Sequence, residues 1–262
     1  KNADVGIAMN SGSEITKEAA DVVLLNDSFA TVTKAVSFGR NVYKNLQRFI
    51  LFQLSVNLTA LIFITVCAVL GLESPFNTLQ LLWINVIMDG PPALTLGLEP
   101  ATDKLMKLKP VKRTDSIVSI KMLIRIVLNG LIMSSIIIAQ HLYNFLGVGV
   151  NEKNSTTFTL FILMQLFNAF NSRTLDLSSV FKSIGKNKVM VYTFLAVFCV
   201  HVFIVQVCGG VFGITKLPLL VWLKCIGTAS LIITFSEIYK WLYRALKGER
   251  LVKKINKNLL GA

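Results

Sequence analysis

The chain has 262 residues, of which 53% are hydrophobic and only 16% charged, and its mean hydropathy is +0.63. A soluble domain carries about 25% charged residues, so this composition argues against an ordinary cytosolic enzyme. The 27 Lys and Arg outnumber the 14 Asp and Glu, which leaves a formal net charge of +13. Beside long apolar runs, membrane topology explains this excess better than nucleic-acid binding, so we expect no nucleic-acid partner. The four cysteines lack C-x-x-C spacing and are interpreted as small hydrophobic residues.

Residues 1–48 contain no predicted membrane-spanning segment. Residues 5–9 and 22–25 are short apolar runs that predict buried strands, and a helix capped at residues 11–13 is predicted between them. A second helix starts near residue 29 and has no obvious stop before the membrane. Strand, helix, strand, helix is typical of an α/β layer, and two strands cannot form a stable sheet alone. We therefore expect residues 1–30 to be the C-terminal edge of a larger Rossmann-like domain, and residues 31–48 to be a stalk helix continuous with the first span.

The fold class expected for the rest is a mainly α, polytopic helical membrane protein. A helix needs about 20 apolar residues to cross the hydrocarbon core of a bilayer. Six segments meet this requirement approximately: residues 49–70, 78–98, 122–143, 157–171, 189–208 and 219–239. The fourth is the weakest, because it is short and contains Gln165 and Asn168. Residues 49–239 are thus predicted to form a six-span transmembrane domain, and residues 240–262 a basic tail.

The basic residues are distributed on one side of this predicted topology. Residues 1–48, 104–121, 173–188 and 240–257 contain 23 of the 27 Lys and Arg, whereas the intervening loops contain only Lys153 and Lys216. Basic loops stay in the cytoplasm, so we expect an integral, multi-pass protein in membrane lipid with both termini cytoplasmic.

The second predicted span contains the most informative residues for function. Asn85 and Asp89 are four residues apart and so lie on one helix face. Gly90, Pro91 and Pro92 follow, and because proline has no N–H, nearby carbonyls lose their helical partners. A carboxylate, an amide oxygen and free carbonyls are the hard ligands that Ca²⁺ selects, and broken helices are where transporters place such sites. The alternative is a proline kink in which a neighbouring helix caps Asp89.

Two other spans carry amides that face in one direction. Gln53 and Asn57 on the first span are candidate oxygen ligands or interhelical hydrogen-bonding groups. On the fourth span, Gln165, Asn168 and Ser172 form a polar stripe for which interhelical hydrogen bonding is the preferred interpretation. The candidate metal ligands are therefore Asn85, Asp89 and Asn57, with Gln165 and Gln53 as secondary candidates.

Several motifs, in order, resemble a type II P-type ATPase. The run DVGIAMNSGSEITKEAADVVLLNDSFATV followed by GRNVYKNLQRFI looks like the end of that family's phosphorylation domain and its stalk helix. LLWINVIMDGPPALTLGLEP resembles the sixth membrane helix, and FTLFILMQLFNAFNSR the eighth helix of plasma-membrane-type calcium pumps. The resemblance covers essentially the whole chain and implies that the six spans are the family's fifth to tenth helices.

The resemblance also implies which residues bind the ion. Asn85, Asp89 and Asn57 match the family's calcium-binding asparagines and aspartate. Ala60, Met88 and Gln165 replace ligands of the two-site pumps, so the chain is similar to single-calcium pumps. GPPALTLGLEP favours secretory-pathway pumps, which also carry Mn²⁺, whereas Asn57 and MQLFNAFNSR favour the plasma-membrane type.

The family's phosphorylation loop and nucleotide-binding domain would precede the first residue. ATP and Mg²⁺ would then act only through a missing N-terminal part, and we expect this chain alone to be inactive, with no catalytic or cofactor-binding residue. The function that follows is the ion-coordinating membrane portion of an ATP-driven calcium pump, present as a C-terminal fragment, with Ca²⁺ as the transported ion. The alternatives are a pump for Mn²⁺ or a monovalent cation, and a standalone six-span subunit without enzymatic activity.

Overall fold

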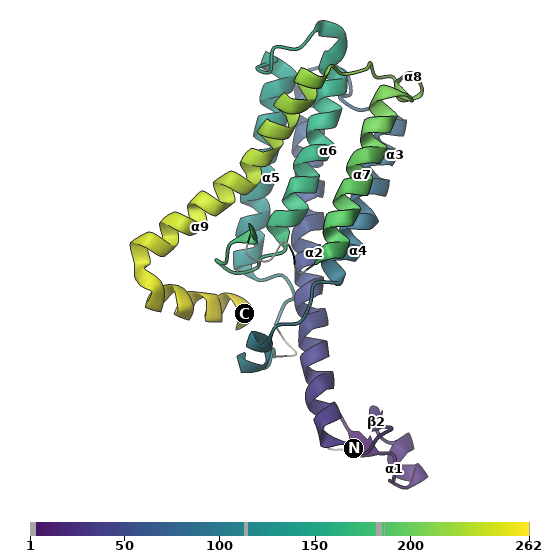
Figure 1. Cartoon of the computed structure of the whole chain (residues 1–262), viewed down its shortest axis with the longest axis vertical. Coiled ribbons are helices and arrows are strands. Elements are labelled where there is room, and N and C mark those ends of the chain that lie inside the picture. Colours follow the sequence, from purple (N-terminus) through teal and green to yellow (C-terminus); the bar gives the residue numbers. More distant parts are fainter. Residues whose placement is uncertain (1–3, 113–114, 182–184, 186, 262) are drawn as a thin grey trace. The chain divides into compact units, whose positions relative to one another are not determined.

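A computed structural model describes the backbone of residues 4–112, 115–181, 185 and 187–261. It describes the side chains of the same residues except 88–89, 103–104, 243 and 246–261. The described part is mostly helical and divides into two compact units (Figure 1). One unit is Lys1–Lys44 with Ala101–Leu108, and the other is Asn45–Pro100 with Lys109–Ala262.

The first unit contains a small parallel sheet. Strands β1 (Ile7–Met9) and β2 (Val22–Leu24) pair in parallel, and helix α1 (Glu14–Glu18) connects them. Ser13 caps α1, because its side chain accepts a hydrogen bond from the Thr16 N–H. This confirms the two strands and the helix predicted between them. The strands are not buried as predicted, since only Ala8 and Leu24 are shielded from solvent and Ile7, Met9 and Val22 are exposed.

The long helix α2 (Phe29–Val69) starts in this unit, and the 3₁₀ helix η1 (Asp103–Lys107) lies against it. The Arg40 guanidinium joins the two, because its Nη1 donates to the carbonyls of Leu105 and Leu108 at 2.8 and 2.9 Å. Two backbone acceptors on one charged donor hold the segment after residue 101 in place.

The second unit is a bundle of helices. After α2 the elements follow in this order: α3 (Thr78–Asp89), α4 (Pro91–Gly97), α5 (Ile120–Tyr143), η2 (Val150–Glu152), α6 (Lys153–Ser172), α7 (Lys188–Gln206), α8 (Gly209–Phe212) and α9 (Leu219–Gly261). Helix α6 lies in the middle, between α5 and α7, and packs along α9 (Figure 1). Its side chains are buried at 17 of its 20 positions. The bundle is therefore built around α6.

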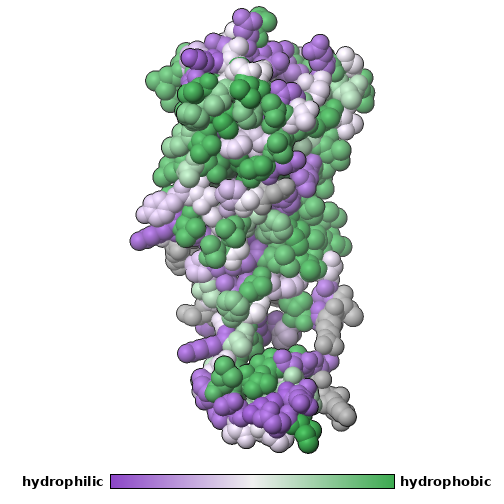
Figure 2. All heavy atoms as spheres, turned by 90° about the vertical axis from the view of Figure 1, so that its right-hand side faces the viewer, coloured by the Kyte–Doolittle hydropathy of each residue, from purple (hydrophilic) through white to green (hydrophobic). Residues whose placement is uncertain are grey.

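The core of the bundle is aromatic and aliphatic. Phe63 of α2, Phe76 before α3, and Phe158 and Phe161 of α6 are buried, and Phe76 meets Phe161 edge-to-face at 5.3 Å. Edge-to-face pairs are favourable beyond the area that they bury. Outside this core, the helices carry extensive apolar surface, which Figure 2 shows on the side of the bundle that carries α7. Such a surface fits a lipid environment, where apolar side chains face outward.

Within the described residues, four helices are long and apolar enough to cross a membrane. They are Phe29–Val69, Ile120–Tyr143, Lys188–Gln206 and Leu219–Leu242. The other two predicted spans are helical, but the second is interrupted between α3 and α4, and α6 is too polar to qualify by composition. The structure thus supports a multi-pass helical membrane protein with four clear spans.

Candidate functional site

The helix that carries the predicted cation ligands is broken. Helix α3 ends at Asp89, Gly90 has φ −88° and ψ −93°, and α4 begins at Pro91. The Gly90 N–H still donates to the Val86 carbonyl at 3.4 Å. A side chain at Gly90 would place its Cβ 3.1 Å from that same carbonyl oxygen, so the glycine permits this close approach. The predicted interruption is therefore confirmed.

The break leaves backbone oxygens without helical donors. In a continuous helix, the carbonyls of Ile87 and Met88 would accept hydrogen bonds from residues 91 and 92, and both are prolines. A proline pair at the start of α4 is compatible with helix geometry, because the first N–H groups of a helix have no intrahelical partner. The sequence thus stops one helix and starts the next within three residues.

Four of the five predicted ligands have side chains that the structure describes, three of them on α2 and α3 and the fourth, Gln165, on α6. Asn85 on α3 and Asn57 on α2 are exposed, and neither side chain makes a hydrogen bond with the residues that the structure describes. Gln53 is half-buried on α2. The side chain of Asp89 lies outside the described residues. The side-chain hydrogen bonds of the described residues do not join Asn57 to Asn85.

The polar side chains of α6 do not make the hydrogen bonds predicted for them in the described structure. Gln165 and Asn168 are completely buried, and neither the amide nitrogen nor the amide oxygen of either side chain has a hydrogen-bond partner in the described structure. The Ser172 hydroxyl is likewise buried and unpartnered there. The interpretation of this stripe as interhelical hydrogen bonds is therefore wrong. A buried polar group without a partner costs about 1–3 kcal/mol, so each one calls for an explanation.

A buried ion pair was missed by the sequence analysis. Glu99 follows α4 and Arg173 follows α6, and the two form a bidentate pair in which Arg173 Nε and Nη2 donate to the carboxylate at 3.0 and 2.6 Å. Their side chains are only 8% and 1% exposed. Asn187, the residue that caps α7, donates from Nδ2 to the same carboxylate at 2.9 Å and to the Thr95 carbonyl at 2.9 Å.

Two side chains of α2, Asn45 and Arg48, join Glu99, Arg173 and Asn187 in one hydrogen-bonded cluster. Asn45 Nδ2 donates to the carbonyls of Gly97 and Glu99 at 2.6 and 3.1 Å. Arg48 donates from Nε to the Arg173 carbonyl at 2.8 Å, and from Nη1 to the Asn45 side chain. The cluster thus ties together α2, the end of α4, the end of α6 and the start of α7. The available signal was an acid shortly after the second predicted span and a base shortly after the fourth.

Comparison with known proteins gives the family. Residues 73–242, more than half of the chain, match the model described as "Cation transporting ATPase, C-terminus". Over 238 residues the chain is 37% identical to "Calcium-transporting ATPase 8, plasma membrane-type" of Arabidopsis thaliana, covering 86% of this chain and 22% of the relative. It is 36% identical to "Calcium-transporting ATPase 5, plasma membrane-type" of Oryza sativa subsp. japonica, with 87% and 22% covered.

A fungal relative agrees. "Calcium-transporting ATPase 1" of Schizosaccharomyces pombe is 35% identical over 268 residues, covering 95% of this chain and 28% of the relative. The chain thus spans roughly a quarter or less of the length of these relatives, consistent with a C-terminal part. The broken helix, the mostly helical membrane bundle and the match over residues 73–242 agree, and the chain belongs to the cation-transporting ATPase C-terminal family.

Proposed function

We propose that this chain is the ion-coordinating membrane portion of a longer calcium-transporting P-type ATPase. The observation that carries the proposal is the interruption between α3 and α4 at Asp89, Gly90 and Pro91. Helices broken at membrane depth supply backbone oxygens that a continuous helix keeps for itself. The relatives' names supply the ion, since the matched proteins are called calcium-transporting ATPases.

The proposed ligands are the Asp89 carboxylate, the Asn85 and Asn57 amide oxygens, and the carbonyls of Ile87 and Met88. Ca²⁺ takes six to eight oxygens, and carboxylates supply most of the attraction. The exposure of Asn57 and Asn85 supports this assignment, because both amides have oxygens available for an ion. Gln165 and Gln53 are secondary candidates, and the unpartnered amide of Gln165 is a potential donor of one more oxygen.

A single calcium site follows from the residues that flank these ligands. A second site would have to be built around Ala60 and Met88, which offer neither a carboxylate nor enough side-chain oxygens. Water would compete well for an ion held so weakly. The stoichiometry that we propose is therefore one Ca²⁺ per phosphorylated pump.

The proposed topology has six crossings. The paired helices α3 and α4 together cover residues 78–97, and α6 is 20 residues long, so each is long enough to cross the hydrocarbon core. Phosphorylation by ATP and Mg²⁺ would occur in the part of the pump that precedes this chain. Helix α2, 41 residues long, is suited to transmit that change toward the ion ligands.

The test is an Asp89→Asn variant of the full-length pump. The change keeps the side-chain size but removes the only acidic group in the proposed site, so calcium-dependent phosphorylation should be abolished while the protein still inserts in the membrane. Phosphoenzyme formation from labelled ATP is measured with Ca²⁺ and with Mn²⁺, alongside equilibrium binding of ⁴⁵Ca. The matched control is Asp115→Asn, since Asp115 is an exposed loop residue.

Three results would decide against parts of this proposal. An Asp89→Asn variant that still responds to Ca²⁺ overturns the site. Two bound calcium ions per phosphoenzyme overturn the single-site stoichiometry. Phosphorylation that depends on Mn²⁺ and not on Ca²⁺ changes the transported ion while leaving the site in place.

A further inference from the structure

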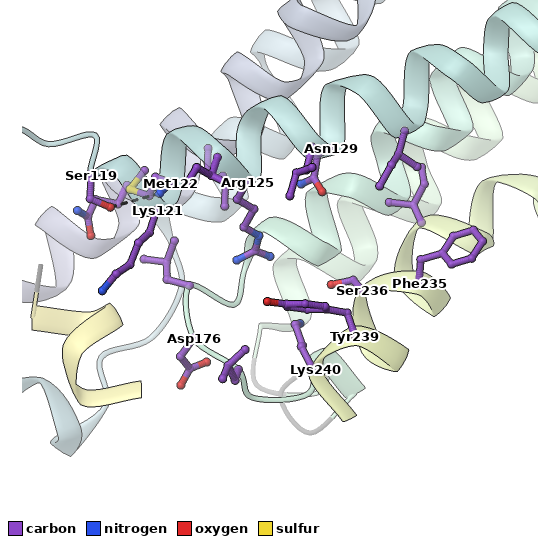
Figure 3. Close-up of a pocket in the computed structure, with 18 of the residues that line it drawn as sticks. Ser119, Lys121, Met122, Arg125, Asn129, Asp176, Phe235, Ser236, Tyr239 and Lys240 are labelled. Carbon is purple, nitrogen blue, oxygen red and sulfur yellow. Dashed lines mark hydrogen bonds between the residues drawn. The ribbon is translucent and has the colours of Figure 1, made fainter. Parts of the chain in front are cut away.

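A cavity of about 550 Å³ lies in the bundle, away from the broken helix. Helix α5 forms one wall and α9 another, and residues 175–177 and part of α2 complete the lining (Figure 3). All of these segments belong to the second unit. Asn57 and Asn85, the proposed calcium ligands whose side chains the structure describes, do not line the cavity, so it needs its own explanation.

One end of the cavity is positively charged. Lys121, Arg125 and Lys240 line it, and Asp176 is the one acidic residue among the described lining residues (Figure 3). Arg125 is held by the carbonyls of Thr174 and Asn171, which accept from its Nη1 and Nη2 at 2.5 and 2.7 Å.

The other two cations of this end differ in how they are held. Lys240 donates to the Thr174 hydroxyl at 2.9 Å and to Glu237 at 3.0 Å. Lys121 is exposed, and it makes no hydrogen bond or ion pair with the residues that the structure describes. The charge of Lys121 is therefore available to a ligand, while Arg125 adds a fixed positive field.

The rest of the cavity is apolar and open. Leu128 and Ile132 follow Lys121 and Arg125 along the same face of α5, and Phe235 lies opposite on α9. These side chains are 53%, 41% and 53% exposed. Between Lys121 and Ile132 the face extends about 16 Å along the helix axis, from the rise per residue of an α-helix. The buried Asn129 Nδ2 in this wall has no hydrogen-bond partner in the described part of the chain.

We propose that this cavity binds a phospholipid with an anionic headgroup. The phosphate and the headgroup charge lie at Lys121 and Arg125, and an acyl chain follows the apolar face through Leu128 and Ile132 to Phe235. A water-soluble anion would use the charged end but would leave the exposed apolar wall uncovered, and a neutral lipid would leave Lys121 unpaired. An anionic lipid pairs its headgroup with the basic residues and covers the apolar wall with its acyl chain.

The test uses the full-length pump that contains this chain, purified in detergent, with bound lipid counted by native mass spectrometry. Phosphatidylserine and phosphatidylcholine with identical acyl chains are titrated in turn, and glycerophosphoserine, the headgroup without acyl chains, is titrated separately. The wild type should bind phosphatidylserine several-fold more tightly than phosphatidylcholine, and glycerophosphoserine should not compete at matched concentration. Lys121→Gln should weaken phosphatidylserine binding about fivefold, the usual effect of one basic residue on an anionic lipid, and should leave phosphatidylcholine unchanged.

Two controls keep the result specific. Lys109→Gln removes a lysine from an exposed loop position that does not line the cavity and should have no effect. Leu128→Trp fills the apolar part and should displace both lipids, whereas Leu123→Trp adds the same bulk to an exposed α5 position outside the lining.

The proposal is overturned by equal binding of the two lipids, by full competition from glycerophosphoserine, or by equal effects of Lys121→Gln and Lys109→Gln. Retained lipid in Leu128→Trp would place the lipid elsewhere and overturn it as well. None of these readouts involves calcium, so the proposal stands or falls separately from the proposed pump function.

Discussion

Glu99 and Arg173 form a buried ion pair. Both side chains are almost completely shielded from solvent, and the carboxylate accepts hydrogen bonds from Arg173 Nε and Nη2 and from Asn187 Nδ2. Burial of two charges is expensive, and the attraction between them offsets that cost only when geometry and hydrogen bonding are good. Here both conditions are met, and removal of the Glu99 charge would take away the carboxylate that pairs with the buried Arg173 guanidinium.

Glu99→Gln should therefore reduce the free energy of unfolding by about 3–5 kcal/mol, because the Arg173 guanidinium would remain buried without its counter-charge. Thermal unfolding of the purified chain in detergent measures the effect. Glu73→Gln is the matched control, since Glu73 is exposed, and it should unfold like the wild type. A Glu99→Gln variant as stable as the control would mean that the pair adds no net stability.

At the scale of elements, helix α5 approaches α2 very closely at one glycine. A Cβ added at Gly130 would lie 2.8 Å from Cδ2, 2.9 Å from Cγ and 3.2 Å from Cβ of Leu58. Atoms cannot remain that close, so a side chain at Gly130 must push the two helices apart or force Leu58 into another rotamer. Small residues at helix contacts have this role in membrane bundles generally.

Gly130→Val should accordingly lower the free energy of unfolding by about 1–3 kcal/mol, the usual cost of overpacking. Gly227→Val on α9 is the control, because a Cβ there meets nothing within 4 Å. Both changes introduce the same β-branched residue into a helix, so the difference between their melting temperatures isolates the α2–α5 contact. Equal melting temperatures would show that the helices repack without cost.

Helix α6 shows a different property of the bundle. It occupies the centre, yet its buried residues include Gln165 and Asn168, whose amides have no partner in the described structure. Such amides lower the mean hydropathy of the helix, which is why composition alone does not identify α6 as a span. Polar groups within membrane-spanning helices generally face the protein interior or an ion pathway. Gln165 and Asn168 of α6 face the interior of the bundle.

For the whole molecule, the distribution of basic residues predicts the orientation in the membrane. The loops and termini on one predicted side hold 23 of the 27 Lys and Arg. Since loops rich in Lys and Arg remain cytoplasmic, both termini should lie on the cytoplasmic side, which requires an even number of crossings.

Epitope tags at the two termini should therefore respond alike to protease in sealed vesicles. A third tag, inserted at the highly exposed Val150 between α5 and α6, should show the opposite protection. Protection of only one terminus would mean an odd number of crossings, with α6 the first candidate for a helix that does not cross.

Patterns over a few neighbouring residues were sufficient to predict the secondary structure. The two short strands, the capped helix between them and the interruption at Asp89, Gly90 and Pro91 were all predictable, because caps, proline chemistry and apolar runs act over a few residues. The ligand assignment of Asn57, Asn85 and Asp89 rests on the same local motifs and remains a proposal.

The amino-acid sequence by itself determined the membrane class, the helical composition and the broken helix, since hydropathy and proline act through neighbouring residues. Only the tertiary structure decided that Glu99 meets Arg173 across 74 positions of chain, that Gly130 lies against Leu58, and that Lys121, Arg125 and Lys240 line one cavity. It also showed that the α6 amides are buried without partners in the described structure instead of pairing with neighbouring helices. These features depend on which helix faces lie together, and helix periodicity specifies a face without specifying its neighbour.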